Sequence, residues 1–171
     1  MKKKHISVIC ILCSFICFSI VLMIRLIQKK DIQKAAIQTI PAFSLPDVNG
    51  QQFTERSLQK HTPTLFLFFD PECENCKEEF KQINIYRDSF PDCQMVFVST
   101  LPENMILDFL ERIDFQPSAN MFFLRDIKAE LMQTIDVKGV PSALIYDKNG
   151  KLIKNYAGQV KIETLIKYLS D

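Results

Sequence analysis

The chain has 171 residues, a length that allows one ordinary domain and an appendage. Its formal net charge of +1 conceals an uneven distribution. Residues 1–34 carry seven Lys and Arg against Asp31 alone, whereas residues 35–171 carry fourteen against nineteen Asp and Glu. A nucleic-acid-binding surface needs clustered positive charge. The composition of the body of the chain therefore argues against a nucleic-acid partner.

The first predicted element is an apolar segment, residues 6–24, which contains no charged residue and no proline. At a helical rise of about 1.5 Å per residue, it nearly matches a hydrocarbon layer of about 30 Å. Lysines precede it, Arg25 follows it closely, and no small residues mark a cleavage site before that charge. We therefore expect residues 1–27 to form an uncleaved signal anchor with one transmembrane helix, and residues 28–40 to form a linker.

From residue 41 onward the sequence alternates strand and helix patterns. Two short apolar pieces around Asn49-Gly50 predict a hairpin over residues 43–53. The run TLFLFF, residues 64–69, predicts a strand buried on both faces. The later predicted elements are a helix with apolar positions from Cys76 to Phe90, a strand at 95–98, a helix at 102–113, a strand at 120–124, a helix at 126–135, an antiparallel hairpin of 142–147 and 151–156, and a helix at 161–169. The pattern predicts an α/β domain with a mixed sheet.

The segment 70-DPECENCKEEF-80 holds the one close cysteine pair of the predicted domain. Cys73 follows a buried strand and opens a helix, and Cys76 begins the apolar stripe of that helix. We therefore expect an exposed sulfur at the helix N-terminus and a partly buried one behind it. Unpaired backbone N–H groups and the helix dipole favour a thiolate at the first position. This arrangement suits thiol–disulfide exchange, in which Cys73 attacks a substrate disulfide and Cys76 resolves the mixed disulfide.

The order strand, C-x-x-C and helix, followed far downstream by Gly139-Val140-Pro141-Ser142 before a strand–turn–strand unit, resembles the thioredoxin superfamily. Residues 41–53 look like the N-terminal extension of its redoxin branch. Residues 73–80, CENCKEEF, resemble the C-E-x-C-K-x-E-F of the membrane-anchored ResA/TlpA-like thiol–disulfide oxidoreductases. Over residues 41–169, this resemblance implies a thioredoxin-like fold: a central mixed β-sheet flanked by helices, with an N-terminal β-hairpin extension. It implies no cofactor and no metal.

The resemblance also implies roles for individual residues. Cys73 and Cys76 would form a redox-active disulfide, and Val140-Pro141 would be a cis peptide bond whose neighbouring backbone binds an extended substrate. The alternative is an ordinary trans proline at a strand start. Glu79 would tune the cysteines and exchange protons with them; the alternative is a solvated acid that the helix dipole favours.

The acids around the cysteine pair suggest a further hypothesis. Their negative charge would oppose the helix dipole, and a less stabilised thiolate makes a dithiol a better reductant. Glu72 stands where most of these proteins have an aromatic residue, so the substrate-facing surface departs from the pattern. Cys93, at the entry to a strand, is expected to be a free structural cysteine, and the alternative is an occasional regulatory disulfide. The acids concerned are Asp70, Glu72, Glu74 and Glu78.

Three other functions remain open. A zinc or copper site would need ligands beyond the pair, but His5 and His61 lie far from it in sequence. A peroxiredoxin-type peroxidase would need a threonine ahead of its nucleophile, and residues 70–72 are Asp-Pro-Glu. A thioredoxin-fold binding module would use the two cysteines as an inert staple, although closing so short a loop stabilises little.

The predicted partners and location follow from this chemistry. The partners are disulfide-containing protein substrates, the membrane through the N-terminal helix, and a membrane electron donor that re-reduces the dithiol. The positive charges flanking residues 6–24 are nearly balanced, so the count does not orient the anchor. A tethered dithiol makes sense beyond the membrane, where disulfides form. We expect a single-pass protein of the bacterial cytoplasmic membrane with its domain on the extracytoplasmic side, and cytochrome c maturation as one possible task.

Overall fold

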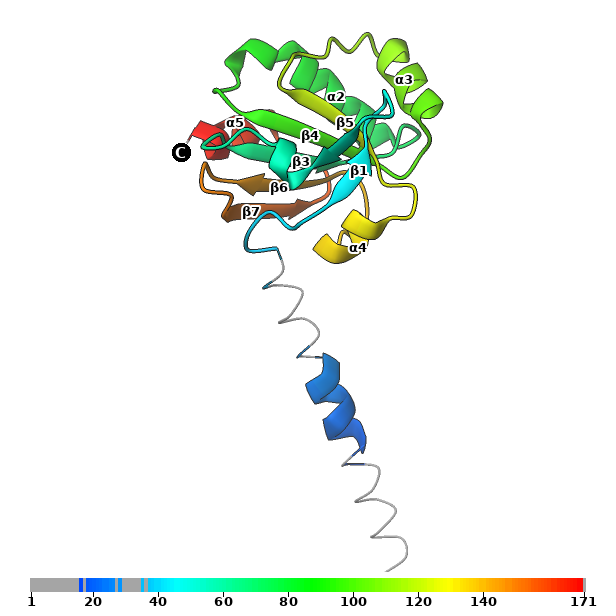
Figure 1. The fold of residues 1–171 in the computed structure, drawn as a ribbon, viewed down its shortest axis with the longest axis vertical. Coiled ribbons are helices and arrows are strands. Elements are labelled where there is room, and N and C mark those ends of the chain that lie inside the picture. The colour runs from blue at the N-terminus through cyan, green and yellow to red at the C-terminus, as the bar shows by residue number, and fades with distance from the viewer. Residues whose placement is uncertain (1–15, 17, 27, 29–34, 36, 171) are drawn as a thin grey trace, which may run out of the picture. The chain divides into compact units, whose positions relative to one another are not determined.

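The structure is a computed structural model that describes residues 16, 18–26, 28, 35 and 37–170. The chain divides into two units, Met1–Ala35 and Ala36–Asp171 (Figure 1). The described residues of the first unit are helical. Within the described part of the chain, no helix is both long enough and apolar enough to cross a membrane. Much of the predicted anchor, including residues 1–15, lies outside the described residues, as do positions 29–34 of the predicted linker.

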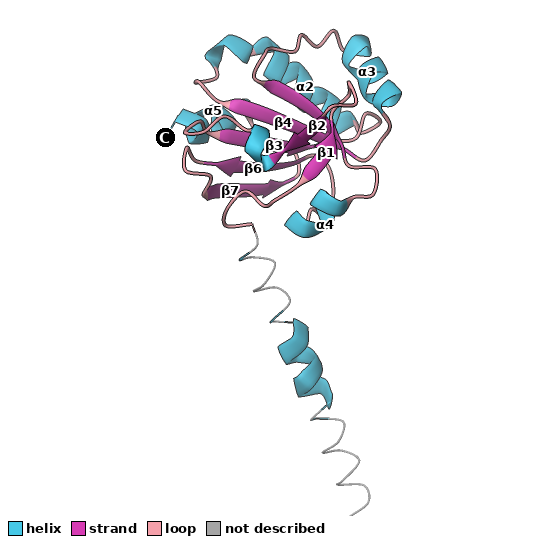
Figure 2. Ribbon diagram, viewed as in Figure 1, coloured by secondary structure: helices cyan, strands magenta, loops and turns pink. Residues whose placement is uncertain are grey.

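A mixed sheet of five strands, in the order β5-β4-β3-β6-β7, forms the centre of the second unit (Figure 2). The strands β3, β4 and β5 are parallel, β6 is antiparallel to β3, and β7 is antiparallel to β6. This is the α/β mixed sheet that the sequence predicts. The strand bounds are β3 Thr64–Phe68, β4 Gln94–Ser99, β5 Met121–Arg125, β6 Ser142–Tyr146 and β7 Leu152–Ala157.

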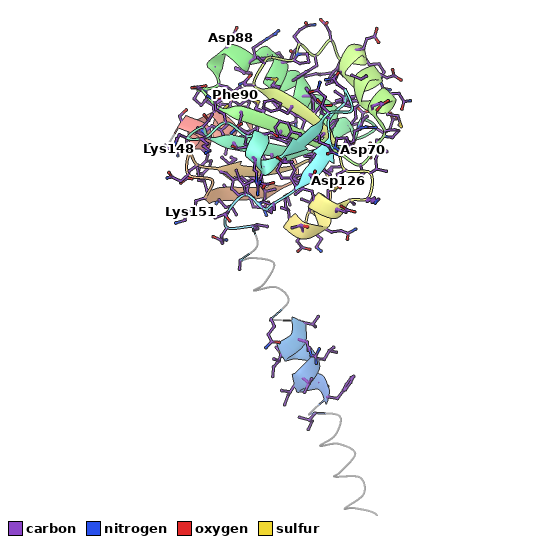
Figure 3. All side chains as sticks on the ribbon, in the orientation of Figure 1. Asp70, Asp88, Phe90, Asp126, Lys148 and Lys151 are labelled. Atoms are coloured by element: carbon purple, nitrogen blue, oxygen red, sulfur yellow. The ribbon has the colours of Figure 1, made fainter. Side chains whose placement is uncertain are left out.

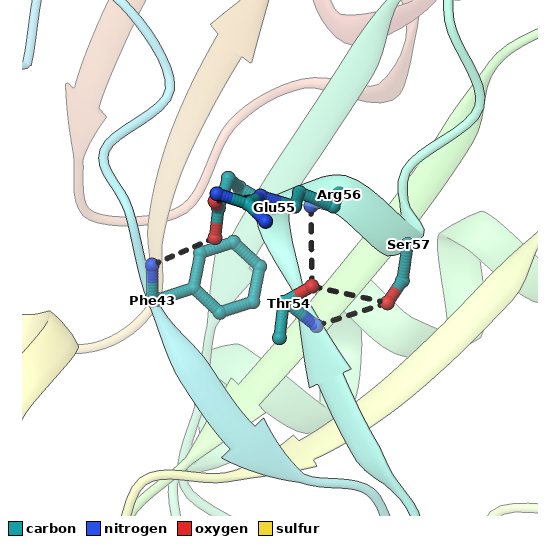
Figure 4. A network of polar contacts seen from close by, with 5 residues as sticks. All are labelled: Phe43, Thr54, Glu55, Arg56 and Ser57. Carbon is teal, nitrogen blue, oxygen red and sulfur yellow. Dashed lines mark hydrogen bonds and ion pairs between the residues drawn. The ribbon is translucent and has the colours of Figure 1, made fainter.

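The predicted hairpin precedes the sheet as a separate antiparallel pair, β1 (Ser44–Pro46) and β2 (Gln52–Thr54). Its turn attaches to the edge strand β5, because the backbone N–H of Val48 donates to the carbonyl oxygen of Phe123 at 3.0 Å. The 3₁₀ helix η1 (Glu55–Ser57) follows, and a reciprocal capping box joins Thr54 and Ser57 (Figure 4). Glu55 accepts a hydrogen bond from the backbone N–H of Phe43, which ties η1 to the start of the hairpin.

Helices and the hairpin cover the two faces of the sheet unequally. The helices α2 (Glu74–Ile85), α3 (Glu103–Arg112) and α5 (Ile162–Ser170) contribute to one core cluster, together with Leu65, Leu67 and Phe97 of the sheet. The hairpin and α4 (Glu130–Ile135) contribute to the other, which includes Phe66 and Val96. Every residue of β3 is buried because both of its faces are covered.

Two helix predictions differ from the structure. The helix predicted at 126–135 begins only at Glu130, because the carboxylate of Asp126 accepts hydrogen bonds from the backbone N–H groups of Glu130 and Met132 and holds the preceding residues in a turn. The helix that starts at the cysteine pair ends at Ile85, before Phe90, and a 3₁₀ turn, η2 (Arg87–Ser89), follows. Pro91 disfavours helical geometry at the residue before it.

Candidate active site

The sulfur of Cys73 lies at the N-terminus of α2, a helix of 12 residues. After β3 the chain turns at Asp70, whose side chain accepts a hydrogen bond from the N–H of Glu72 at 2.8 Å and whose carbonyl accepts one from the N–H of Cys73 at 3.0 Å (Figure 3 labels Asp70). Cys73 is the N-cap residue, and its side chain makes no capping hydrogen bond. Cys73 is a partly exposed residue.

The Val140-Pro141 peptide bond is cis, as the resemblance implies. The sulfur of Cys73 lies 3.7 Å from the carbonyl oxygen of Val140, so the two predicted parts of the site are adjacent. The hydroxyl of Ser142 donates to the carbonyl of Gly139 at 2.7 Å on one side of this bond. On the other side, the N–H of Gly158 donates to the carbonyl of Pro141 at 2.8 Å. These hydrogen bonds fix the shape of the proline loop and join it to the segment between β7 and α5.

Cys76 is fully buried in the core cluster on the α2 side of the sheet. Burial is the main reason that the pKa of this thiol is raised well above its ordinary value, and the charges of Cys73 and Glu79 act in the same direction. A backbone hydrogen bond from Asp70 partly offsets the increase. At neutral pH Cys76 is therefore a thiol, and it needs a proton acceptor before it can attack a disulfide.

Glu79 lies one helical turn after Cys76 and is only 1% exposed, so it is not a solvated acid. Neither carboxylate oxygen makes a hydrogen bond. Burial raises the pKa of Glu79 from 4.5 to about 7, and the nearby backbone N–H of Val160 offsets part of the increase without reaching hydrogen-bond geometry. A buried, unpaired carboxyl that titrates near neutrality can act as a general acid or base.

Cationic partners neutralise part of the negative charge around the pair. Glu74 forms an ion pair with Lys77 at 2.6 Å, and this cation holds the pKa of Glu74 below its usual value. Glu72 pairs with Arg112 of α3 at 3.3 Å. The acids therefore oppose the helix dipole less than their number suggests.

Cys93 is not part of this site. Cys73 follows the C-terminal end of β3, whereas Cys93 precedes the N-terminal end of the parallel strand β4. The two cysteines therefore lie at opposite ends of the strands. Cys93 is 1% exposed, and burial raises its pKa to about 12. Its carbonyl accepts a hydrogen bond from Asn120 at 2.6 Å. These contacts fit the structural role expected from the sequence.

The sequence reasoning missed the loop between β7 and α5, where Gly158 binds the proline loop and Val160 lies near Glu79. The isolated Gly158, two residues after the predicted strand 151–156, was the available signal. For the metal hypothesis, no group of three or more His, Cys, Asp or Glu that could hold an ion occurs in the described ranges. The pair and Glu79 thus form a compact site of two thiols and one carboxyl.

Solved structures with the same fold include proteins of redox function. The structure of Mycobacterium tuberculosis (MTB) dsbF in mixed oxidised and reduced forms has 21% sequence identity and a TM-score of 0.65, covering 80% of this chain and 96% of that one. A secreted M. tuberculosis disulfide oxidoreductase homologous to E. coli DsbE has 18% identity and a TM-score of 0.63, covering 75% and 94%. Peroxidoxin BcpB of M. tuberculosis has 19% identity and a TM-score of 0.64, covering 77% and 92%.

At these identities the structural likeness shows the fold. A comparison with curated proteins gave no match. The family described as the Thioredoxin-like domain matches residues 51–171, which include both cysteines, Glu79 and the proline loop. The chain belongs to the thioredoxin-like family.

Proposed function

We propose that this chain is a thiol–disulfide oxidoreductase that reduces disulfide bonds of protein substrates. The observation that carries the proposal is the placement of Cys73, a partly exposed residue at a helix N-terminus whose sulfur lies 3.7 Å from the Val140 carbonyl oxygen, with the buried Cys76 three residues later. An exposed nucleophile in front of a sheltered second thiol is the arrangement that disulfide exchange requires.

The reaction proceeds in two exchanges. The thiolate of Cys73 attacks one sulfur of the substrate disulfide, forms a mixed disulfide, and releases the other substrate sulfur as a thiolate. Cys76 then loses its proton and attacks the sulfur of Cys73, which releases the second substrate sulfur and leaves a Cys73–Cys76 disulfide. Two electrons pass from the protein to the substrate, and an external dithiol donor restores the reduced pair.

Glu79 acts as the proton acceptor for Cys76 in the second exchange. Its charge already raises the pKa of Cys76, which places the two groups close enough to interact. Its own pKa of about 7 lets it take a proton and return it near neutrality. The alternative, an inert structural carboxyl, leaves unexplained why both buried oxygens lack partners.

We further propose that the domain is tethered by the apolar residues 6–24 and acts on the extracytoplasmic side of a bacterial cytoplasmic membrane. The support is the length of that segment and the ResA/TlpA-like sequence of residues 73–80. Dithiol reductants are needed where disulfides form, and there a membrane electron donor has to resupply them. Candidate substrates are apocytochromes whose C-x-x-C-H is reduced before haem attachment, or extracytoplasmic disulfides more generally.

The test of the redox function is the reduction potential of the Cys73–Cys76 pair, obtained by equilibrating the chain with glutathione and dithiothreitol buffers. A value near or below about −270 mV supports a reductase, whereas a value near about −120 mV indicates a disulfide donor. The absence of a reversible dithiol would leave a binding module. Consumption of hydrogen peroxide by the chain, if it is lost in Cys73→Ser, would favour the peroxiredoxin-type alternative.

The test of the location uses reporters fused to the C-terminus, one active only in the cytosol and one active only outside it. Activity of the extracytoplasmic reporter is expected. Activity of the cytosolic reporter alone would contradict the proposed orientation. Recovery of the fusion protein in the soluble fraction would contradict the proposed tether. Removal of residues 1–27 provides the control for membrane association.

A further inference from the structure

The segment between β7 and α5 connects the proline loop with the buried carboxyl of the site. At its start, the N–H of Gly158 donates to the carbonyl of Pro141 at 2.8 Å. Gly158 has a φ of +92°, a conformation that side chains with a Cβ rarely adopt. Two residues later, the backbone N–H of Val160 comes close enough to Glu79 to lower its pKa. One short segment therefore contacts both the proposed substrate-binding loop and the proposed proton acceptor.

Val160 also lies at a boundary between the core and the surface. Its side chain is 9% exposed and belongs to the same apolar cluster as Cys76 and Phe80. The same residue lines a groove of about 570 Å³ between α2 and the start of α5. The remaining lining is mostly polar: Glu78, Gln82, Gln159, Lys161, Ile162 and Glu163. Water can therefore occupy the groove up to Val160.

Glu79 lies on the dry side of this boundary. It is 1% exposed, both of its oxygens lack hydrogen-bond partners, and it does not line the groove. A buried carboxyl of this kind can exchange its proton with solvent only when a neighbouring group moves. Val160 lines the groove, and its backbone N–H is the group of the β7–α5 segment that acts on the carboxyl.

We propose that Val160 is a positioning residue that separates Glu79 from the groove, and that the hydrogen bond between Gly158 and Pro141 ties this barrier to the substrate-binding loop. A substrate that binds along Val140-Pro141 displaces the loop, and through Gly158 it moves Val160 away from Glu79. The carboxyl then meets water in the groove and releases to it the proton taken from Cys76. The inference rests on the proposed function for the role of that proton, but the barrier itself can be tested without turnover.

Other titratable groups near Glu79 are accounted for. The N-cap contributes Cys73, and α2 contributes Cys76 and Glu78, of which Glu78 lines the groove. The turn before the helix adds Asp70, whose carboxylate already accepts the N–H of Glu72. The start of α5 presents Lys161 and Glu163 to the groove. Tyr156 of β7 and Tyr168 of α5 pack against the same cluster and contact one another. None of these side chains supplies the main effect on Glu79, which comes from its burial.

The test is the titration of Glu79 in the full-length chain, followed by NMR of carboxyl-labelled glutamate, with Glu79→Gln to assign the signal. In Val160→Ala we expect the pKa of Glu79 to fall by about one unit or more, because water from the groove reaches the carboxyl. Val96→Ala is the matched control, since it truncates a buried valine in the cluster on the other face of the sheet. It should leave the Glu79 titration unchanged, as should Val160→Ile.

An unchanged Glu79 titration in Val160→Ala would overturn the barrier. If that variant does not fold, Gly158→Ala takes its place, because a Cβ at a φ of +92° strains the backbone and displaces the segment. An unchanged Glu79 titration in Gly158→Ala would also contradict the barrier. The proposed link between the proline loop and Val160 is tested by trapping a peptide as a mixed disulfide on Cys73 in the Cys76→Ser variant. The Glu79 titration should then shift, and by less in the added presence of Val160→Ala. A chain without a reversible dithiol would contradict the proposed function, whereas a Glu79 signal insensitive to all of these changes would contradict the inference alone.

Discussion

The sulfur of Cys73 and the carbonyl oxygen of Val140 lie 3.7 Å apart, although 67 residues separate them in the chain. The antiparallel pairing of β3 with β6 produces this contact. Phe68, at the end of β3, lies opposite Ser142, at the start of β6. The residues just after β3 and just before β6 therefore meet at one edge of the sheet, and a substrate bound to the proline loop presents its disulfide to Cys73.

The first prediction concerns the two sulfurs. Cys76→Ser should accumulate a mixed disulfide with a substrate, because Cys73 can still attack and nothing resolves the adduct. Cys73→Ser should form no adduct, since Cys76 is fully buried. Mass spectrometry of the intact chain after reaction with a disulfide-containing peptide measures both. Cys93→Ser, which removes the thiol at the far edge of the sheet, is the control and should turn over normally. Adduct formation in Cys73→Ser would contradict the assignment.

Local patterns in the sequence predict most of the fold but only part of the site. The short apolar runs predict the five strands, and the helical spacing of apolar residues that starts at Cys76 predicts α2 and its buried face. The burial of Glu79 does not follow from that pattern, because a charged residue on a helix is ordinarily exposed. It depends on α2 packing against the start of α5, which is set by contacts across about 80 residues of chain. The role of Asp126 was missed because its hydrogen bonds run to the following turn and shorten α4.

The second prediction is the contribution of Glu79 to the pH dependence of stability. Burial raises its pKa in the folded chain from 4.5 to about 7, so the folded state binds the proton more tightly than the unfolded state. The resulting stabilisation is complete below about pH 4.5, declines as the pH rises, and is lost above about pH 7. It amounts to roughly 3 kcal/mol.

Glu79→Gln should remove this dependence, because a glutamine carries no charge at either pH. Urea unfolding of the two proteins at several pH values between these limits measures the difference in the free energy of unfolding. The variant should match the parent below the lower limit and exceed it in stability above the upper one. Parallel stability curves for the two proteins would show that the carboxyl is not buried in solution.

The third prediction concerns Phe80, which lies behind the cysteine pair on α2. Its ring centroid is 4.7 Å from that of Phe69, 5.0 Å from Phe97, 5.1 Å from Phe109 and 5.2 Å from Phe115. Phe80→Ala should lower the free energy of unfolding by about 3–5 kcal/mol, because it removes buried surface and leaves a cavity between four rings. Phe80→Leu keeps much of the volume and should cost less. A loss below roughly 1 kcal/mol for the alanine variant, measured by urea unfolding, would contradict this packing.

The fourth prediction concerns Asp126, which lies beside α4 (Figure 3) and is 1% exposed. Its two oxygens accept hydrogen bonds from the N–H groups of Glu130 at 2.8 Å and Met132 at 2.9 Å. Asp126→Asn turns one acceptor into a donor that faces an N–H group, so one buried amide loses its partner. The free energy of unfolding should fall by about 1–3 kcal/mol.

Asp126→Ala should lower the free energy of unfolding by at least as much, because both N–H groups then lose their acceptor. Lys128→Ala is the matched control: it changes an exposed position in the same turn and should have little effect on stability. Asp126 lines a hollow with Ser44, Leu45 and Pro46 of the hairpin, and it is not part of the core cluster that contains Cys76. The reduction potential of the cysteine pair should therefore stay at the parent value in all three variants under conditions where they remain folded. A potential that moves with Asp126→Asn would mean that α4 and the proline loop are mechanically coupled, and the site would then extend across the sheet.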